Sequence, residues 1–356
     1  MQSKASQYKK LNPIQSGSFS TVYKGYSTKL DEYVALKVIP KSKFSKRGMA
    51  NEFSVEKILS QDEGCPFICS VIDFYEDEVN YVLVLEYCEC GDFYDFLELS
   101  KKKGDLNAPS IIKLNFQKVV LQLCYSVRYS HSLGIAHRDI KPENMLINYN
   151  GDIKLADWGH AIRAMFSNDN NIGTDNYRAP ETFSSKVSYN TYKADYWSIG
   201  VSLLYLLFCH CPFRCSNIKN EKVIYKKLEN GDNLIYPNCH NFVDYINDPY
   251  KFIYDNFFSS VSLNKKRSLF KLNSSRYITP YLWQDLTDMQ DLFDLTKIIV
   301  DNLLSPDPND RSLTKFLKSF NCFWSACEQG KNEMPRSVVR NVKSNNLKAV
   351  GVTGEY

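Results

Sequence analysis

The sequence lacks long apolar runs and a strong excess of charge of one sign. Its most apolar stretch, residues 199–211, falls well short of the ~20 residues that span a bilayer, so we expect a buried helix there and no membrane span. The net charge is only +4 in 356 residues, which excludes nucleic-acid binding driven mainly by phosphate neutralisation. Apolar residues make up 44% and charged residues 24%, so the chain as a whole is not disordered.

Cysteine is too sparse for a disulfide scaffold, with 11 residues in the chain. Together with the lack of an apolar signal segment, this predicts reduced thiols and a cytoplasmic, intracellular location. Asp and Glu are missing from the first 30 residues, so an organelle such as the mitochondrion is the alternative. The folded pattern begins near Tyr8, however, which leaves little room for a cleavable targeting segment.

Apolar periodicity predicts a small β-rich part followed by a larger helical part. Residues 14–24, 33–39 and 81–87 have the Val-, Tyr- and Phe-rich composition of strands, and a helix is expected within 43–59. After Gly91 the pattern becomes helical and begins with an amphipathic stretch at 112–127.

Two later regions lack clear periodicity. Residues 230–285 are rich in Tyr and Asn, and we expect an irregular insert there. Residues 328–356 are polar and contain no sizeable apolar cluster, which predicts a disordered tail.

Four short motifs stand in a fixed order along the chain. They are VALK at 34–37, HRDIKPEN at 137–144, DWG at 157–159 and APE at 179–181, followed by DYWSIG at 195–200 and by Arg311. Their order and spacing resemble the catalytic domain of eukaryotic protein kinases of the serine/threonine type, over residues 8–320. The NDPYKF run at 247–252 resembles a branch of fungal regulatory serine/threonine kinases.

The resemblance implies an α+β fold of two lobes. A small, mainly β N-terminal lobe would span 8–87, with one helix, and a larger, mainly α C-terminal lobe would span 91–320. It also implies ATP and Mg²⁺ as cofactors, proteins with Ser or Thr acceptors as substrates, and a monomer.

The motif residues suit phosphoryl transfer, which needs charge neutralisation and in-line positioning more than covalent help. Asn144 and Asp157 supply the oxygen ligands that Mg²⁺ prefers. Lys37 would hold the α- and β-phosphates, Asp139 would accept or orient the proton of the attacking hydroxyl, and Lys141 would steady the γ-phosphate. Each acid taken singly is more often a surface charge or a helix cap.

Lys37 needs an anionic partner on the neighbouring helix, and two glutamates compete for that role. Glu52 shares a helical side with the apolar residues Val55 and Leu59, which favours it. Glu56 has the more usual distance to Pro66 for the family and is the alternative.

The nucleotide lid departs from the family pattern of three glycines, because only Gly17 remains. Since glycine lets backbone amides approach phosphates closely, we expect a stiffer lid that holds ATP less well. By resemblance, the adenine would lie between apolar residues of both lobes, the chain linking the lobes would offer backbone hydrogen bonds, and Asp92 would meet the ribose. The expected nucleotide-binding residues are Ile14, Gln15, Ser16, Gly17, Ser18, Phe19, Ser20, Thr21, Val22, Ala35, Lys37, Leu85, Glu86, Cys88, Asp92 and Leu146.

Two departures bear on regulation. Trp158 replaces the usual Phe of the metal-binding triplet, as in the catalytic subunit family of casein kinase two, and its bulk should bias the triplet toward the active arrangement. Asn170 stands where a phosphorylated Ser or Thr is common. The preceding Asp169 would then pair with Arg138 in place of a phosphate, unless the loop is simply polar and exposed.

Acceptor choice can also be inferred by resemblance. Lys141 and Thr174 stand where the serine/threonine branch places them beside the acceptor hydroxyl. Glu143 and Asp92 would attract a basic residue upstream of the target, or else serve the nucleotide or the structure.

Three further matches are expected to be structural. Glu181 and Arg311 would form a buried ion pair, and Asp195 would brace the backbone around His137.

Two other functions compete with an active protein kinase. The poor glycine lid would suit a pseudokinase that acts as a scaffold or allosteric binding module, against which the complete set of catalytic residues argues. A kinase for a small molecule is the third reading, and the APE segment with Thr174 favours a peptide acceptor instead.

Overall fold

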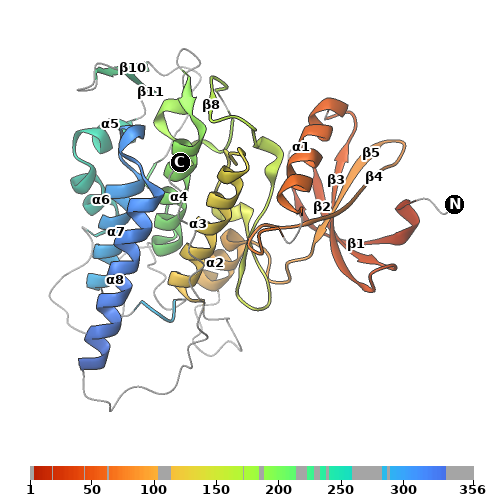
Figure 1. Cartoon of the computed structure of the whole chain (residues 1–356), viewed down its shortest axis with the longest axis horizontal. Coiled ribbons are helices and arrows are strands. Elements are labelled where there is room, and N and C mark those ends of the chain that lie inside the picture. The colour runs from red at the N-terminus through yellow and green to blue at the C-terminus, as the bar shows by residue number, and fades with distance from the viewer. Residues whose placement is uncertain are drawn as a thin grey trace.

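The protein has two lobes, seen side by side in the computed structural model (Figure 1). A five-stranded sheet with one helix forms the N-terminal lobe, and helices dominate the C-terminal lobe. The structure describes residues 4–17, 19–43, 45–61, 64–102, 114–170, 172–183, 188–213, 223–227, 233–237, 240–258, 283–286 and 289–333.

The N-terminal lobe is an antiparallel sheet in the order β1-β2-β3-β5-β4, preceded by a short 3₁₀ turn, η1. Its central strands are the most apolar, since Val34, Leu36 and Val84 are buried where β3 pairs with β5. The expected strand at 14–24 is divided, because the lid turn at Gly17 separates β1 from β2. The bounds are η1 Lys4–Gln7, β1 Tyr8–Ser16, β2 Thr21–Ser27, β3 Glu32–Pro40, β4 Val71–Glu76 and β5 Asn80–Glu86.

Helix α1 (Lys46–Leu59) packs against this sheet and turns one face toward the cleft between the lobes. The hydroxyl of Ser45 caps it by accepting a 3.0 Å hydrogen bond from the Gly48 backbone N–H, which satisfies one of the free amides at a helix start. Met49 and Phe53 pack on the sheet side, while Val55 and Leu59 join the main core.

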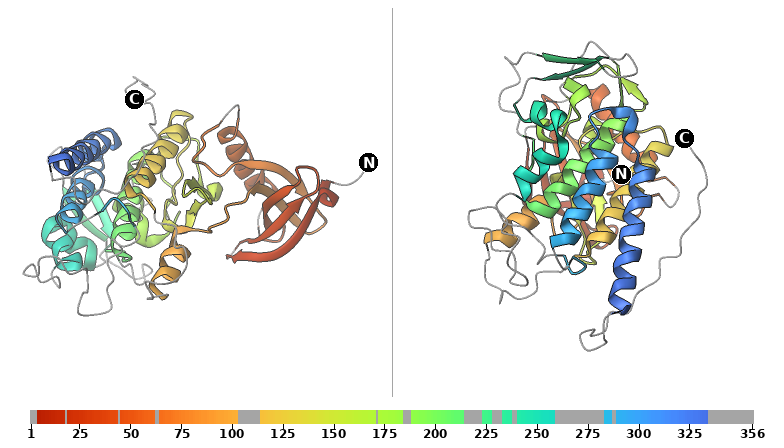
Figure 2. Two further views of the ribbon diagram at one scale, coloured as in Figure 1. Left: turned by 90° about the horizontal axis from the view of Figure 1, so that it is seen from below. Right: turned by 90° about the vertical axis from the view of Figure 1, so that its left-hand side faces the viewer.

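The C-terminal lobe is built around α4 (Thr191–Phe208), which covers most of the longest apolar stretch. Its residues are buried on all sides, as expected for a helix without a polar face. Cys209 ends it with a left-handed backbone, φ 48°. The other helices surround α4 (Figures 1 and 2) and are α2 Phe93–Lys102, α3 Phe116–Ser132, α5 His240–Asn247, α6 Pro249–Phe257, α7 Met289–Leu303 and α8 Leu313–Glu333.

Short elements connect the helices of this lobe, and one of them, η3, packs against α1. Two of them, β6 and β7, form a small hairpin, and β8 pairs with β9. The bounds are η2 Pro142–Asn144, β6 Met145–Ile147, β7 Ile153–Leu155, η3 Trp158–His160, β8 Phe166–Ser167, η4 Asp175–Tyr177, η5 Pro180–Phe183, β9 Tyr189–Asn190 and η8 Pro308–Asp310.

The prediction of an irregular insert at 230–285 was wrong for α5 and α6. Their aromatic side chains are buried, and Phe242 stacks on Phe213 with ring centroids 5.0 Å apart. This region also includes β11 (Asn233–Pro237), which pairs with β10 (Val223–Lys227). Residues 259–282 lie outside the described residues.

The prediction of a disordered tail over 328–356 was wrong for its first residues, which are helical. Residues 328–333 belong to α8, and 334–356 lie outside the described residues. The amphipathic pattern of α8 includes the buried Phe316, Phe320 and Trp324, which anchor the first part of this helix to the core.

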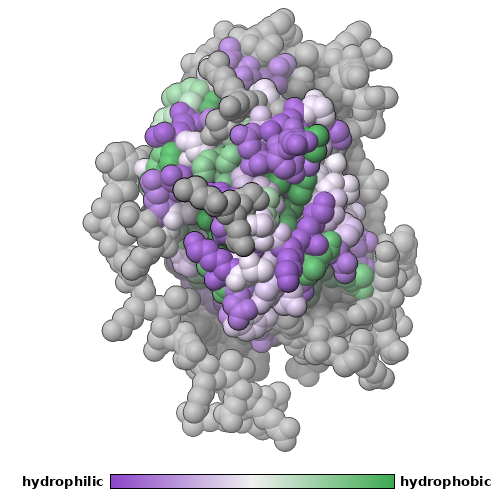
Figure 3. Space-filling view, turned by 90° about the vertical axis from the view of Figure 1, so that its right-hand side faces the viewer, coloured by the Kyte–Doolittle hydropathy of each residue, from purple (hydrophilic) through white to green (hydrophobic). Residues whose placement is uncertain are grey.

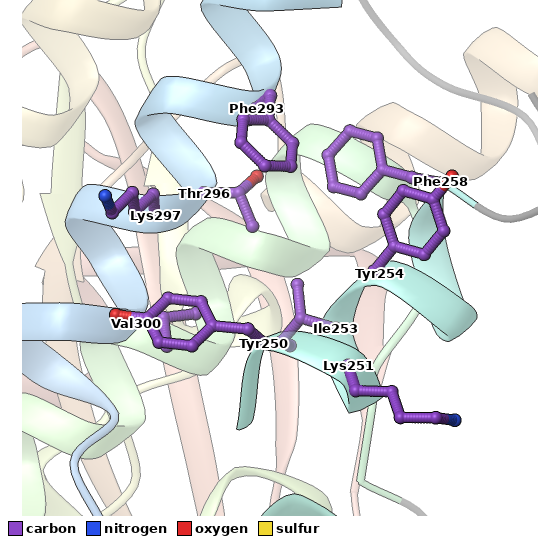
Figure 4. A pocket seen from close by; sticks show the side chains of 9 residues that line it. All are labelled: Tyr250, Lys251, Ile253, Tyr254, Phe258, Phe293, Thr296, Lys297 and Val300. Atoms are coloured by element: carbon purple, nitrogen blue, oxygen red, sulfur yellow. The ribbon is translucent and has the colours of Figure 1, made fainter. Parts of the chain in front are cut away.

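The surface of the N-terminal lobe alternates hydrophilic and hydrophobic residues (Figure 3). On the far side of the C-terminal lobe, α6 and α7 border an open pocket of about 290 Å³ lined by Ile253, Phe258 and Phe293 (Figure 4). None of the described helices combines the length and apolar character that crossing a bilayer requires.

Candidate active site

The site begins with the loop that carries Asp139, which a buried aspartate braces. Asp195, on α4, accepts hydrogen bonds from the backbone N–H groups of His137 (2.9 Å) and Arg138 (2.8 Å). The ring of His131, on α3, lies 2.8 Å from the same carboxylate. This confirms the bracing role predicted for Asp195 and fixes the backbone on which Asp139 stands.

His137 is fully buried and neutral in this loop. Burial lowers its pKa, although the nearby charges of Asp195 and Asp139 oppose that effect. Its Nδ1 accepts a hydrogen bond from the Asp139 backbone N–H (3.2 Å), and its Nε2 lies 3.0 Å from the Ala156 carbonyl oxygen. Nε2 therefore carries the ring proton and donates a hydrogen bond to the Ala156 carbonyl oxygen. This bond links the Asp139 loop to the residue before Asp157.

Gly173 lets the segment from Asp157 to Glu181, the activation segment, cross this loop closely. Its φ is 89°, and a Cβ added here would lie 2.3 Å from the Arg138 carbonyl oxygen. Any other residue would therefore push Thr174 away from Asp139.

Asp139 lies at the centre of a compact polar group. Lys141 Nζ lies 2.9 Å from Asp139 Oδ2 and donates to Thr174 Oγ1 at 2.6 Å. The Thr174 hydroxyl in turn donates to Asp139 Oδ1 at 2.7 Å, and Asn144 Nδ2 donates to the Asp139 backbone oxygen at 2.8 Å. The structure thus brings together four residues that the sequence pattern assigns to chemistry.

Burial would raise the pKa of Asp139, but bonds from His160 and Lys141 outweigh it and lower the pKa to about 2. The carboxylate is therefore ionised at neutral pH and acts as a hydrogen-bond acceptor.

Lys37 joins the two lobes. Its Nζ lies 2.7 Å from Glu52 Oε1 on α1 and 2.8 Å from Asp157 Oδ1, which follows β7. Burial alone would lower the pKa of Lys37, but the charges of Asp157 and Glu52 raise it well above its ordinary value. Lys37 likewise lowers the pKa of Asp157 below its usual range. Glu52, and not Glu56, holds the contact with Lys37.

Glu56 is nevertheless buried beside this ion pair. Burial and the charge of Glu52 raise its pKa to about 8. Its Oε2 has no hydrogen-bond partner among the described residues.

Trp158 is 1% exposed and packs its ring against His137, with centroids 4.4 Å apart. A buried indole N–H usually has a hydrogen-bond partner, but within the described ranges Nε1 of Trp158 has none. The ring is held by apolar packing, and Asp157 beside it points to Lys37 with a left-handed φ of 63°.

The predicted adenine pocket is a small apolar cluster between the lobes. Ala35 and Leu85 are buried in it, and Val22 and Leu146 pack against them. Ile14 lies outside this cluster and is 48% exposed. The lobes therefore present apolar surface where the resemblance places the base.

The lid is a tight turn between β1 and β2. The Gly17 N–H donates to the Ser20 carbonyl oxygen at 2.9 Å, while Gln15 pairs with Val22 in the ladder. Ser16 and Thr21 pair at its base, and Phe19 is exposed. Ser18 lies outside the described residues.

The segment linking the lobes is partly engaged by the protein itself. The Glu86 backbone N–H donates to Ser70, and its side chain contacts Lys154 at 2.8 Å, so this amide is not free for a purine. Cys88 is buried. Asp92 caps α2 by accepting a hydrogen bond from the Asp95 N–H at 2.8 Å, and its backbone pairs with that of Leu146 in an isolated antiparallel β-bridge.

Asp169, in the activation segment, forms an ion pair with Arg138. Arg138 Nη1 lies 2.9 Å from Asp169 Oδ2, and Arg138 Nε donates to the His160 carbonyl oxygen at 2.7 Å. The contact predicted from the sequence is present. The guanidinium also lowers the pKa of Asp169.

The predicted pair beneath this segment is confirmed. Arg311 is fully buried and holds Glu181 with two bonds, of 2.6 and 2.9 Å. It also donates to the Ser305 carbonyl oxygen at 2.8 Å.

The donor set fits a nucleotide with a hard cation. The Asn144 side-chain nitrogen donates to Asp139, which leaves the side-chain oxygen as the ligand atom. Asp157 adds a carboxylate nearby, since the Ala156 N–H before it donates to the Asn144 carbonyl oxygen. Lys37 offers a fixed ammonium for phosphate oxygens.

The sequence analysis did not identify His160 as a site residue, and it left the role of Glu143 open. His160 Nδ1 lies 3.6 Å from Asp139 Oδ2, and its place directly after the DWG triplet is the signal that would have found it. Glu143 Oε2 is buried and lacks a hydrogen-bond partner in the part of the chain that the structure describes. Its charge raises the pKa of the neighbouring Tyr177 after the larger effect of burial.

Two lobes joined by a lysine–carboxylate contact, with an aspartate held beside a lysine and a threonine, define a phosphotransferase. The chain belongs to the protein kinase family, because the sequence profile of the protein kinase domain matches residues 8–319.

Curated relatives agree with this assignment. The chain is 48% identical over 337 residues, covering 89% of this chain and 87% of the relative, to the probable serine/threonine-protein kinase FMP48 of Saccharomyces cerevisiae. It is 34% identical to the serine/threonine-protein kinase ksp1 of Schizosaccharomyces pombe (58% of this chain, 44% of the relative). It is 32% identical to the CBL-interacting serine/threonine-protein kinase 20 of Arabidopsis thaliana (62% and 48%).

Proposed function

We propose that this protein transfers the γ-phosphoryl group of ATP to serine and threonine hydroxyls of protein substrates. The observation that carries the proposal is the polar group around Asp139, which places an ionised carboxylate, an ammonium and a threonine hydroxyl within hydrogen-bond distance of one another. The serine/threonine kinases among its relatives support the same acceptor class.

Each residue has a defined task in this reaction. Asp139 accepts the proton of the attacking hydroxyl or orients it, and Lys141 stabilises the charge that develops on the transferred group. Lys37, held by Glu52, fixes the α- and β-phosphates. Asn144 and Asp157 would hold Mg²⁺, which neutralises phosphate charge when it is bound.

The substrate is further proposed to carry a basic residue upstream of the acceptor. Glu143 and Asp92 are acids at the expected peptide side, and burial raises the pKa of both carboxyls. Among the described residues, Glu143 Oε2 has no hydrogen-bond partner, and an arginine of the substrate would supply one. Asp92 already caps α2, so Glu143 is the stronger candidate.

The pseudokinase alternative has no support in this site, since Lys37, Asp139, Asn144 and Asp157 are all present. Lys37 contacts Asp157, Asn144 contacts Asp139, and the Ala156 N–H next to Asp157 donates to the Asn144 carbonyl oxygen. The predicted monomer and intracellular location stay predictions.

A positional peptide library tests the proposal. Purified protein with Mg·ATP should label peptides with central Ser or Thr and leave those with Tyr unlabelled, with arginine selected upstream. The E143Q variant should keep Ser/Thr labelling and lose the arginine selection. Labelling of tyrosine peptides, or of none while a lipid or sugar is phosphorylated, would contradict the acceptor class.

A further inference from the structure

The pocket between α6 and α7 exposes several aromatic side chains on one surface of the C-terminal lobe. Tyr250, Tyr254 and Phe293 line it and are 54%, 42% and 44% exposed (Figure 4). Ile253, which also lines the pocket, is buried and belongs to the main core. A contiguous exposed apolar surface of this kind marks a place where another apolar group binds.

The aromatic wall of the pocket, formed by Tyr254, Phe258 and Phe293, is already ordered. Phe258 packs edge-on against Phe293 with ring centroids 5.5 Å apart, and Tyr254 stacks on Phe258 at 6.3 Å. Phe258 also packs edge-on against Phe208 of α4 at 5.5 Å, which fixes the wall to the central helix. Binding against such a wall costs little conformational entropy, because few side chains have to be immobilised.

The chain itself leads from this wall into a segment of suitable length. Phe258 is only 6% exposed and is the last described residue before the segment 259–282. Trp283, which follows the segment, is buried, and its indole N–H donates to the Leu206 carbonyl oxygen at 3.2 Å. Both ends of the segment 259–282 are therefore attached to the core of the C-terminal lobe.

The composition of the segment 259–282 complements the pocket. The segment carries the adjacent apolar residues Leu269 and Phe270, and it contains no Asp or Glu. Its basic residues are Lys265, Lys266, Arg267, Lys271 and Arg276. On the other side, α6 with its cap and α7 hold more acids than bases, namely Asp248, Asp255, Asp291, Asp294 and Asp301 against Lys251 and Lys297. Complementary charge favours the association of these two surfaces and fixes its orientation.

The covalent connection favours this segment over an unconnected partner. Leu269 follows Phe258 by 11 residues, and at ~3.3 Å per residue such a stretch reaches up to about 36 Å. Leu269 and Phe270 can therefore return to the pocket. A group on a short flexible connection is present at an effective concentration on the order of millimolar.

We propose that the pocket between α6 and α7 is the docking site of this chain's own segment 259–282. Leu269 and Phe270 pack against the aromatic wall, and the basic residues on either side of this pair lie toward the aspartates of α6 and α7. Docking removes apolar surface from water on both partners, which is the main driving force.

Limited proteolysis of the full-length protein by trypsin tests this docking without relying on catalysis. Trypsin cuts after Lys and Arg, and the segment has such sites at Arg267 and Lys271, directly beside the apolar pair. When docking and release are fast, the cutting rate follows the population of the released form. Mass spectrometry measures the first cut within 265–271, with cuts after Arg336 and Arg340 as the internal reference.

Two variants remove the proposed contact from its two sides. F293A removes part of the wall, and L269S/F270S removes the apolar pair without changing charge. Each should raise the cutting rate within 265–271 by at least about 10-fold, because the burial of a large apolar side chain is lost. The controls are Y149A, at an exposed tyrosine outside the pocket, and S274A/S275A, in the same segment. Both should stay within about 2-fold of wild type.

Combining the changes shows whether the wall and the apolar pair act together. F293A/L269S/F270S should be cut no more than about 2-fold faster than L269S/F270S, since both changes remove the same contact. Rate increases that multiply would overturn the proposal. If F293A does not show a wild-type circular dichroism spectrum, Y254A replaces it as the wall variant.

Three further outcomes would also contradict the docking of this segment. They are an L269S/F270S variant cut at the wild-type rate, a wild-type protein cut within 265–271 as fast as after Arg336, and protection that grows with protein concentration. The last result would assign the pocket to the segment of a second copy. None of these results bears on phosphoryl transfer, so the proposed function is tested separately.

Discussion

Replacing Arg311 by alanine should destabilise the C-terminal lobe. We expect this loss to exceed that of an alanine substitution at any other residue of the ion pairs described. Arg311 is fully buried and holds both oxygens of Glu181, which is itself only 9% exposed. The guanidinium also donates to the carbonyl oxygens of Ser305 and Lys193 and lies over the Trp197 ring at 4.8 Å. Alanine would leave an unpaired buried carboxylate and would remove the guanidinium donor from three carbonyl oxygens, those of Ser305, Lys193 and Pro306.

Removing one partner of a buried ion pair costs about 3–5 kcal/mol. At roughly 2–4 °C per kcal/mol, the unfolding temperature of the R311A variant should fall by about 6–20 °C. Calorimetry or circular dichroism measures this shift. The K251A variant, which removes one side of the exposed Lys251–Asp255 pair, is the control and should unfold at the wild-type temperature.

A second comparison separates folding from chemistry. At a temperature where R311A is still folded, its kcat should stay within a few-fold of wild type, because Arg311 lies away from Asp139. An R311A variant as stable as wild type would refute the reasoning about the buried pair. So would a stable R311A variant without activity.

Three other predictions concern the cleft. The Q15G/S20G variant should lower the KM for ATP, because glycines restore close backbone approach at the lid, and an unchanged KM would contradict this. The D169N variant should lose several-fold activity through the broken contact with Arg138, while phosphatase treatment of wild type should change nothing. Because the pKa of Asp139 is lowered to about 2 from 3.8, its stabilising contribution should be complete above about pH 4 and be lost as the pH falls toward 2, a slope that D139N should lack.

The sequence predicted the polar contacts of the site well, because each motif residue has a charge or a hydrogen-bonding role that few partners can meet. The choice of Glu52 over Glu56 came from its shared helical side with Val55 and Leu59, and the structure places Glu52 on Lys37. The pairing of Glu181 with Arg311 followed in the same way.

The sequence could not predict α5 and α6, because their order depends on contacts distant in the chain. Tyr245 packs edge-on against Trp197, with centroids 5.8 Å apart, and Phe242 stacks on Phe213. Local periodicity in a Tyr- and Asn-rich stretch is too weak to reveal such packing. The burial of Glu56 was equally hidden, since nothing in the sequence shows how far α1 sinks into the cleft.

The central claim is that Asp139 serves phosphoryl transfer and not nucleotide binding. The direct measurement compares wild type with D139N for the transfer of labelled γ-phosphate from Mg·ATP to a serine peptide, and for ATP affinity by calorimetry. The account predicts that transfer falls by at least about 100-fold, as expected when a general base or orienting group is lost, with ATP affinity within a few-fold of wild type. A D139N variant that transfers phosphate at the wild-type rate would contradict it.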